Sequence, residues 1–323
     1  MATKKMVDVF SDIDRDTALK ANPSGYAITE LAAEDDRIVT LTADLSNVLA
    51  EFRKAFPERY IELGIAETNS VSLAAGMASC GFRPYIFSMA PFGVLKTAEQ
   101  LRTDADYNHL PVRLVGRLSG LAMGYFGTSH YAVEDLAIAR MMANTTVVAP
   151  ADPNAVLGIM RATADLDGPV YIRIAEATDP VYDEVPEFAH GQWPRLREGH
   201  DITLAGHGMG VGLAVGAAKV LQDEHGIGAD VYDAAYIKPF DEAAIVATAS
   251  RTGKVLTIED HIEIGGLGSI VAETVGRHKL AVDLMQAALP DKDLEVGVPA
   301  ELYEYYGLTV PGVVAKALEL MKR

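Results

Sequence analysis

The chain has 323 residues, of which 49% are hydrophobic and 23% charged, enough for two globular domains with separate cores. Its 28 Lys and Arg are outnumbered by 45 Asp and Glu, which leaves a formal net charge of −17. Phosphate contacts need clustered basic residues, so this charge argues against a nucleic-acid partner and equally against an anionic membrane surface.

The N-terminal segment carries acids where a secretory signal would carry an apolar stretch. No run reaches the roughly 18 apolar residues of a membrane-spanning helix. Cys80 is the one cysteine of the chain, so no intramolecular disulfide can form. We therefore expect a soluble cytoplasmic enzyme, with Cys80 buried among small residues near a helix end.

Apolar, β-branched runs alternate with helical patterns in the first half, which predicts a parallel α/β sheet with crossover helices. The expected strands are residues 37–41, 60–63, 84–87, 112–115, 146–149 and 170–174. Residues 178–196 carry prolines and acids without periodicity, which is typical of a linker. The pattern then restarts, with strands at 202–205, 229–232, 254–258 and 281–284 and helices at 210–224 and 267–275. We expect a first domain with its linker at residues 1–190 and a smaller α/β domain at residues 191–323.

Glu67 lies where the expected strand 60–63 turns directly into a helix of small residues that ends near Gly81. Ligands of open α/β sheets bind beyond the carboxyl ends of the strands, so this carboxylate is a candidate cofactor contact. The alternative is a solvated acid that complements the helix dipole, worth about 0.3–1 kcal/mol. One helix face is expected to pack closely against a neighbour. It comprises Ala66, Ser70, Leu73, Ala74 and Met77.

Two glycine clusters, at residues 206–212 and 265–268, follow expected strands and open expected helices. The first completes no dinucleotide fingerprint, so it predicts a tight turn, with an anion at the helix N-terminus left open. The second lacks the lysine of a P-loop and predicts a close-packed domain or subunit contact. No zinc-ligand spacing and no serine nucleophile elbow occur. His130, in the loop 127–135, is either a surface residue or a functional one.

Four ordered segments carry a family resemblance. They are residues 55–69 (AFPERYIELGIAETN), 110–135 (LPV onward to GTSHYAVED), 144–152 (NTTVVAPAD) and 168–173 (GPVYIR). Together they resemble the pyrimidine-binding and C-terminal domains of the transketolase family of thiamine-diphosphate enzymes, nearly end to end. The resemblance implies an α/β fold of two three-layer, parallel-sheet domains: a thiamine-diphosphate pyrimidine-binding fold followed by a transketolase C-terminal-like fold.

The resemblance also implies roles for individual residues. Glu67 would be the carboxylate that shares a proton with N1′ of the cofactor's aminopyrimidine. His130 would face the donor ketose and bind or exchange protons at its oxygens. The aminopyrimidine would stack on the segment that holds Met89 and Phe92, where Met89 replaces the more usual Phe. Asp44 would lie near the cofactor.

The chain contains no Gly-Asp-Gly, the motif with which full-length transketolases hold Mg²⁺ and the diphosphate. By resemblance it is therefore the C-terminal subunit of a split transketolase. A separately encoded diphosphate-binding subunit would hold the diphosphate and Mg²⁺ (or Ca²⁺), and the expected assembly is an α2β2 heterotetramer that uses thiamine diphosphate.

The donor site departs from the family pattern. Tyr125 and Phe126 stand where sugar-phosphate transketolases usually have Glu-Asp, and Leu118 and Glu176 stand where a His and an Arg usually hold the phosphate. Losing a cation and gaining a carboxylate would repel a phosphate dianion, although the neighbouring Arg117 could compensate. We expect transfer of a two-carbon ketol unit between sugars other than the standard pentose phosphates.

Three alternatives remain at this stage. One is the beta subunit of a 2-oxoacid dehydrogenase decarboxylase component, which shares both domains. The second is 1-deoxyxylulose-5-phosphate-synthase-like chemistry, which normally occurs in one long chain. The third is a non-catalytic subunit that kept the fold, against which the retention of Glu67 and His130 argues.

Overall fold

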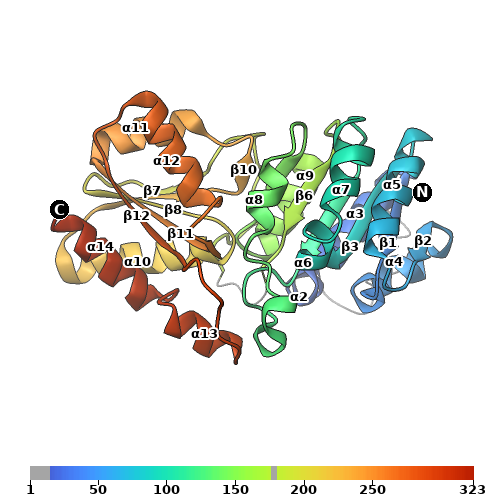
Figure 1. The fold of residues 1–323 in the computed structure, drawn as a ribbon, viewed down its shortest axis with the longest axis horizontal. Helices are drawn as coiled ribbons and strands as arrows, with labels where there is room; N and C mark the ends of the chain where they lie inside the picture. Colours follow the sequence, from blue (N-terminus) through green and yellow to red (C-terminus); the bar gives the residue numbers. More distant parts are fainter. Residues whose placement is uncertain (1–14, 176–179) are drawn as a thin grey trace.

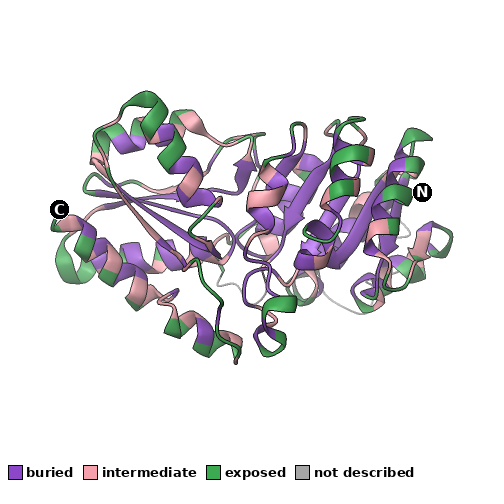
Figure 2. Ribbon diagram, viewed as in Figure 1, coloured by how far each residue is buried: buried purple, intermediate pink, exposed green. Residues whose placement is uncertain are grey.

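The computed structural model describes residues 15–175 and 180–323, with the backbone alone at residues 15 and 16. Two sheets, each flanked by helices, lie next to each other along the molecule (Figure 1). Figure 2 shows that the strands of both sheets are largely buried, whereas the helices expose one face. This confirms the expected α/β class, because strands buried on both faces need helices on both sides.

The first sheet has seven strands in the order β10-β5-β6-β4-β3-β1-β2, parallel except for β10. All six strands expected in the first half are present: β1 (Ile38–Thr42), β2 (Tyr60–Glu62), β3 (Arg83–Met89), β4 (Arg113–Arg117), β5 (Thr146–Val148) and β6 (Val170–Arg173). The helical elements around them are α2 (Arg15–Ala21), α3 (Pro23–Glu34), η1 (Ser46–Leu49), α4 (Ala50–Ala55), η2 (Pro57–Arg59), α5 (Glu67–Ser79), α6 (Ala90–Val94), α7 (Ala98–Gln100), η3 (Leu101–Asp106), η4 (Gly124–Ser129), α8 (Asp135–Arg140) and α9 (Pro153–Thr163).

The second sheet has five strands in the order β12-β11-β8-β9-β7. Its strands are β7 (Arg195–Arg197), β8 (Ile202–Gly206), β9 (Ala229–Asp233), β11 (Lys254–Ile262) and β12 (Asp283–Leu289). Its helices are α10 (Met209–His225), α11 (Glu242–Thr252), α12 (Leu267–His278), α13 (Pro299–Tyr305) and α14 (Val310–Met321). In Figure 1, α11 and α12 lie on one side of this sheet and α10 and α14 on the other, which gives the expected three layers.

Two strands do not follow from the sequence pattern. β7 forms at the end of the expected linker and pairs antiparallel with β9. β10 (Tyr236–Lys238) comes from the second half of the chain but pairs antiparallel with β5 in the first sheet. Strands this short carry little periodicity of their own, so their existence depends on the edge that they cover.

Buried Arg173, at the end of β6, ties the two halves together. Its guanidinium donates to Asp135 Oδ2 at 2.9 Å and to Asp260 Oδ1 of β11 at 2.6 Å, and all three side chains are inaccessible to solvent. Burial opposes the charged form, but the two carboxylates outweigh it and raise the pKa of Arg173 above its ordinary value. This network fixes β11 against the first domain.

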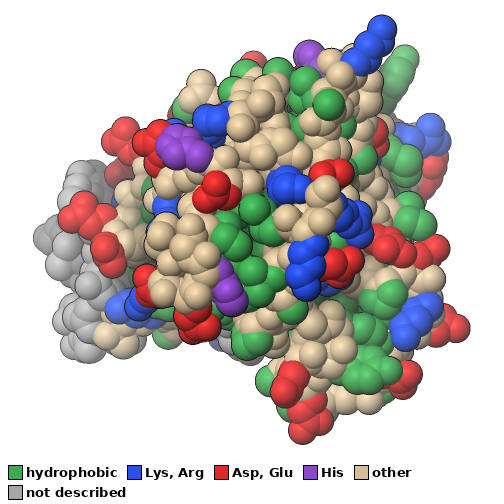
Figure 3. Space-filling view, turned by 90° about the vertical axis from the view of Figure 1, so that its left-hand side faces the viewer, with side chains coloured by type: hydrophobic (Ala, Val, Ile, Leu, Met, Phe, Trp, Pro, Cys, Tyr) green, Lys and Arg blue, Asp and Glu red, His purple; other side chains and the backbone are tan. Residues whose placement is uncertain are grey.

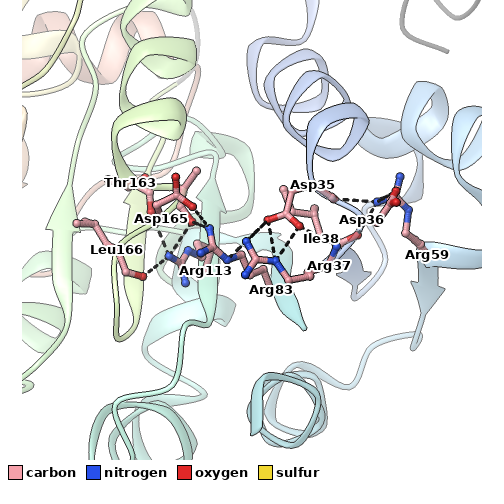
Figure 4. A network of polar contacts seen from close by, with 11 residues as sticks. Asp35, Asp36, Arg37, Ile38, Arg59, Arg83, Arg113, Thr163, Asp165 and Leu166 are labelled. Carbon is pink, nitrogen blue, oxygen red and sulfur yellow. Dashed lines mark hydrogen bonds and ion pairs between the residues drawn. The ribbon is translucent and has the colours of Figure 1, made fainter. Parts of the chain in front are cut away.

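A second polar network lies at the amino-terminal edge of the first sheet (Figure 4). Arg113, at the start of β4, is buried and donates from Nη2 to the carbonyl oxygens of Thr163 and Ala164, at 3.2 and 3.0 Å, and of Leu166. These carbonyl groups lie at or just after the C-terminal end of α9, where carbonyl oxygens lack the hydrogen bonds of the helix interior. The network therefore stabilises the amino-terminal edge of the sheet. The site is expected at the opposite edge, where the carboxyl ends of the strands lie.

Candidate active site

The structure places Glu67 as the first residue of α5, directly after the turn that follows β2. Gly64 in that turn has φ +64°, a left-handed conformation that favours glycine and lets the chain reverse within a few residues. The Glu67 residue is only 4% exposed. The solvated first-turn acid that the sequence left open is therefore wrong, because this carboxylate is buried.

Glu67 does not stand alone. Lys96 Nζ donates a hydrogen bond of 2.7 Å to Glu67 Oε2, although the two residues are far apart in the sequence. The lysine side chain is 48% exposed, whereas that of Glu67 is 5% exposed. Sequence reasoning missed Lys96. Its signal was its position four residues after Phe92, in the turn that follows α6 (Ala90–Val94).

A cavity of about 330 Å³ opens at the carboxyl ends of the strands of the first sheet. It brings together Glu67, His130, Phe92, Met89 and Asp44, the catalytic and cofactor candidates of the sequence. The lining residues are Ala43, Asp44, Leu45, Ile65, Glu67, Met89, Phe92, Lys96 and His130. Apolar walls around one buried carboxylate are what a flat heteroaromatic ring with polar edge atoms requires.

The imidazole of His130 is held by aromatic neighbours. Its ring stacks on Phe126 with centroids 4.6 Å apart and meets Phe92 edge-on at 5.1 Å. Ser129 Oγ lies 2.8 Å from His130 Nδ1. Within the described ranges, Nε2 is thus the ring nitrogen without a hydrogen-bond partner, and it remains available to a ligand.

Two candidate residues carry unusual backbone angles. Asp44, just after β1, has φ 62°, and Leu118, just after β4, has φ 58°. Non-glycine residues rarely adopt positive φ, and such conformations concentrate at functional sites. The exposed Asp44 belongs to the cavity of Glu67, but Leu118 does not line it.

The remaining donor-site candidates lie elsewhere. Arg117 lines a separate cavity of about 140 Å³, where its Nη1 lies 3.4 Å from Asn22 Oδ1. Glu176 lies outside the described residues. Phe126, on η4, is 59% exposed and faces solvent beside the site. The structure therefore brings Phe126, but not Arg117, next to His130.

Two packing expectations are wrong. Cys80 is exposed, because α5 ends just before it and the following turn faces solvent. Leu73 is also exposed, although Ser70 and Ala74 of the same expected helix face are buried. The buried residues of the helix are Glu67, Ser70, Val71, Ala74, Ala75 and Ala78.

The glycine clusters serve packing. A Cβ at Gly210 would lie 2.3 Å from the carbonyl oxygen of Ile258, so the tight turn at residues 206–212 allows α10 to approach β11 closely. At the second cluster, the Glu259 carboxylate accepts from the backbone N–H groups of Leu267 and Gly268 at 2.7 and 2.8 Å. A Cβ at Gly265 would lie 2.5 Å from that of Ala137 in the first half, which confirms a close-packed contact between domains.

Family models match both halves of the chain. The model of the transketolase pyrimidine-binding domain matches residues 21–178, and that of the transketolase C-terminal domain matches residues 191–313. The chain belongs to the transketolase family. It is 34% identical to one of the subunits of the apulose-4-phosphate transketolase of Phocaeicola vulgatus, over 92% of this chain and 95% of that protein. It is 36% identical to the 6-deoxy-6-sulfo-D-fructose transketolase subunit SqwH of a Clostridium species, over 92% of each.

Solved structures of transketolases have the same fold as this chain. A split gene transketolase, described as an inactive beta4 tetramer, superimposes with a TM-score of 0.87 and 36% identity over 94% of this chain and 98% of that one. The Pichia stipitis transketolase in complex with sedoheptulose 7-phosphate shares the fold, with a TM-score of 0.76 and 20% identity over 94% of this chain and 46% of that one. The 1-deoxy-D-xylulose-5-phosphate synthase of Syntrophotalea carbinolica is 33% identical over 92% of this chain, which spans 47% of that enzyme.

Three further observations concern membranes, surface charge and metal ions. None of the helices in residues 15–175 and 180–323 combines the length and hydropathy that a bilayer crossing requires. On the face shown in Figure 3, basic side chains are interspersed with acidic ones and do not form a continuous basic patch. Within the same described ranges, His, Cys, Asp and Glu side chains form no cluster suited to a metal ion.

Proposed function

We propose that this chain is the C-terminal subunit of a split transketolase, which transfers a two-carbon ketol unit from a ketose to an aldose with thiamine diphosphate. The observation that carries the proposal is the buried Glu67 carboxylate in a cavity walled by Met89, Phe92 and His130. The relatives support it, because proteins named as transketolase subunits align over nearly their whole length.

The residues of the cavity fit the aminopyrimidine half of thiamine diphosphate. Glu67 would meet the ring nitrogen, and Phe92 and Met89 would pack on the ring. We infer that a diphosphate-binding subunit, which supplies the Gly-Asp-Gly motif absent from this sequence, holds the diphosphate and Mg²⁺ (or Ca²⁺). An α2β2 heterotetramer is the assembly that we propose.

When bound, thiamine diphosphate supplies a carbanion equivalent that attacks the donor carbonyl. The residues of this chain prepare and support that chemistry. Glu67 holds a proton at the pyrimidine N1′, and the burial of its side chain limits the access of water to that proton. His130, fixed between Phe126 and Phe92, presents Nε2 to the hydroxyl and carbonyl oxygens of the donor sugar. Asp44 lies at the cavity wall as a further polar contact.

Phe126 shapes the proposed donor selectivity. It covers one face of His130 with an apolar ring where a carboxylate would otherwise contact a donor hydroxyl. Together with Leu118 and Glu176, which stand in the sequence where a His and an Arg usually hold the phosphate, and with Arg117 next to Leu118, this favours a ketose other than the standard pentose phosphates. The names of the relatives support the idea, since one is named for apulose 4-phosphate and another for 6-deoxy-6-sulfo-D-fructose.

The test is reconstitution. The chain would be mixed with a diphosphate-binding transketolase subunit, thiamine diphosphate and Mg²⁺, and two-carbon transfer would be assayed over phosphorylated and unphosphorylated ketoses. We expect transfer with the wild type and with the surface control Glu58→Gln, and loss of transfer with Glu67→Gln. Full activity of the Glu67→Gln assembly would refute the proton role. Acetyl or hydroxyethyl products from pyruvate, without ketol transfer, would instead favour the decarboxylase or deoxyxylulose-phosphate alternatives.

A further inference from the structure

The ion pair between Lys96 and Glu67 joins two side chains with very different access to solvent. The carboxylate is buried and the lysine is half exposed, yet Nζ and Oε2 are 2.7 Å apart. An ionised carboxylate in an apolar wall is costly unless it is paired. Lys96 therefore supplies the charge that makes the buried carboxylate tolerable in the free subunit.

The cation can leave at little cost when another hydrogen-bond donor takes its place at the carboxylate. Its ammonium group ends a flexible four-carbon stem and already reaches water, so its departure strands no buried positive charge. Because the ammonium group stays half exposed in the pair, exchanging it for another donor changes the free energy by no more than about 1 kcal/mol, the order of a surface ion pair. The hydrogen bond between Lys96 and Glu67 therefore forms in the free subunit, and a ligand that donates to the carboxylate can replace it.

Lys96 also stands on the cofactor side of the site. It lines the same cavity as Glu67, Met89 and Phe92. Phe92 lies on α6 and Lys96 in the turn that follows it, and the ring expected to pack on the pyrimidine and the ammonium that binds the carboxylate line the same cavity. The pyrimidine nitrogen of the cofactor would therefore approach a carboxylate to which the Lys96 ammonium group is already bound.

We propose that Lys96 is a displaceable counter-ion of Glu67: it neutralises the carboxylate in the free subunit and competes for it with the pyrimidine ring of the cofactor. This inference rests on the proposed function. Lys96 is a positioning residue in this account, because it acts through Glu67 and not on the substrate. Cofactor loading then includes the release of Lys96 into solvent.

Calorimetric titration of thiamine diphosphate, with Mg²⁺ present, into the assembled enzyme tests the competition without any turnover. We expect Lys96→Met to bind the cofactor about two- to fivefold more tightly than the wild type, which is the affinity equivalent of one half-exposed ion pair. Lys96→Arg keeps the cation and should bind like the wild type. Lys54→Met, the same change at an exposed lysine outside the cavity, should leave the affinity unchanged.

A double-mutant cycle shows whether the effect passes through Glu67. In the Glu67→Gln background, Lys96→Met should no longer change the affinity, and Lys96→Gln serves as a second variant whose thermal midpoint confirms folding. An unchanged or weaker affinity of Lys96→Met, or an equal gain in the Glu67→Gln background, overturns the inference. A wild-type assembly that binds no thiamine diphosphate refutes the proposed function itself, so the two failures are distinct.

Discussion

The carboxyl group of Asp233, at the end of β9, makes folding stability depend on pH. Burial raises the pKa of Asp233 to about 7 from an ordinary value of 3.8, and the neighbouring Asp152 carboxylate adds to the effect. Tyr182 Oη donates to Asp233 Oδ2 at 2.8 Å and opposes the shift without cancelling it. The folded chain therefore binds a proton that the unfolded chain releases between these two pH values.

The sign follows from this difference in bound protons. Stability contributed by the protonated form is present at low pH and is lost as the pH rises through about 7. Each pH unit corresponds to about 1.4 kcal/mol, so the loss between about pH 5.5 and pH 7 amounts to about 2 kcal/mol. Above pH 7 the contribution levels off.

Asp233→Asn removes the titration while it keeps the shape of the neutral acid. Urea unfolding from pH 5.5 to 8.5, followed by the fluorescence of buried Trp193, should show the wild type losing about 2 kcal/mol relative to Asp233→Asn. Tyr182→Phe removes the opposing hydrogen bond and should move the loss to higher pH. Parallel pH profiles of the wild type and Asp233→Asn would refute the assignment.

Three further predictions concern packing and selectivity. Arg173→Met should cost about 3–5 kcal/mol in urea unfolding, because it leaves Asp135 and Asp260 buried without their cation; a loss below about 1 kcal/mol would contradict the bracing role. Gly210→Ala should cost about 1–3 kcal/mol because its Cβ would strike the Ile258 carbonyl, whereas Gly76→Ala, with open space around it in α5, should stabilise the chain by about 0.5–1 kcal/mol; equal shifts in thermal midpoint would refute the packing argument. Phe126→Asp should raise kcat/KM for pentose-phosphate donors at least about tenfold relative to the wild-type assembly, which corresponds to about 1.4 kcal/mol of transition-state binding, because it restores a carboxylate beside His130. An unchanged donor profile would show that Phe126 does not determine donor selectivity.

The sequence alone determined most of the elements and the main candidates, although not β7, β10 or Lys96. Alternation of apolar runs and helical patterns predicted all six strands of the first half; for all but the edge strand β2 the reason is that a strand buried on both faces has to be largely apolar. The turn from β2 into α5 predicted Glu67 at the carboxyl end of the sheet, since a parallel strand followed by a helix leaves the first helical residue at that edge. These inferences needed only neighbours in the chain.

Only the tertiary structure decided which partners these residues meet. The contact of Lys96 with Glu67, the ion pairs of Arg173 with Asp260, and the addition of β10 to the first sheet all join segments far apart in the sequence. The exposure of Cys80 was missed for the same reason, because a small-residue helix end can face either a neighbour or solvent. Local periodicity fixes which face of an element is apolar, but packing against distant segments fixes what that face touches and which charges become buried together.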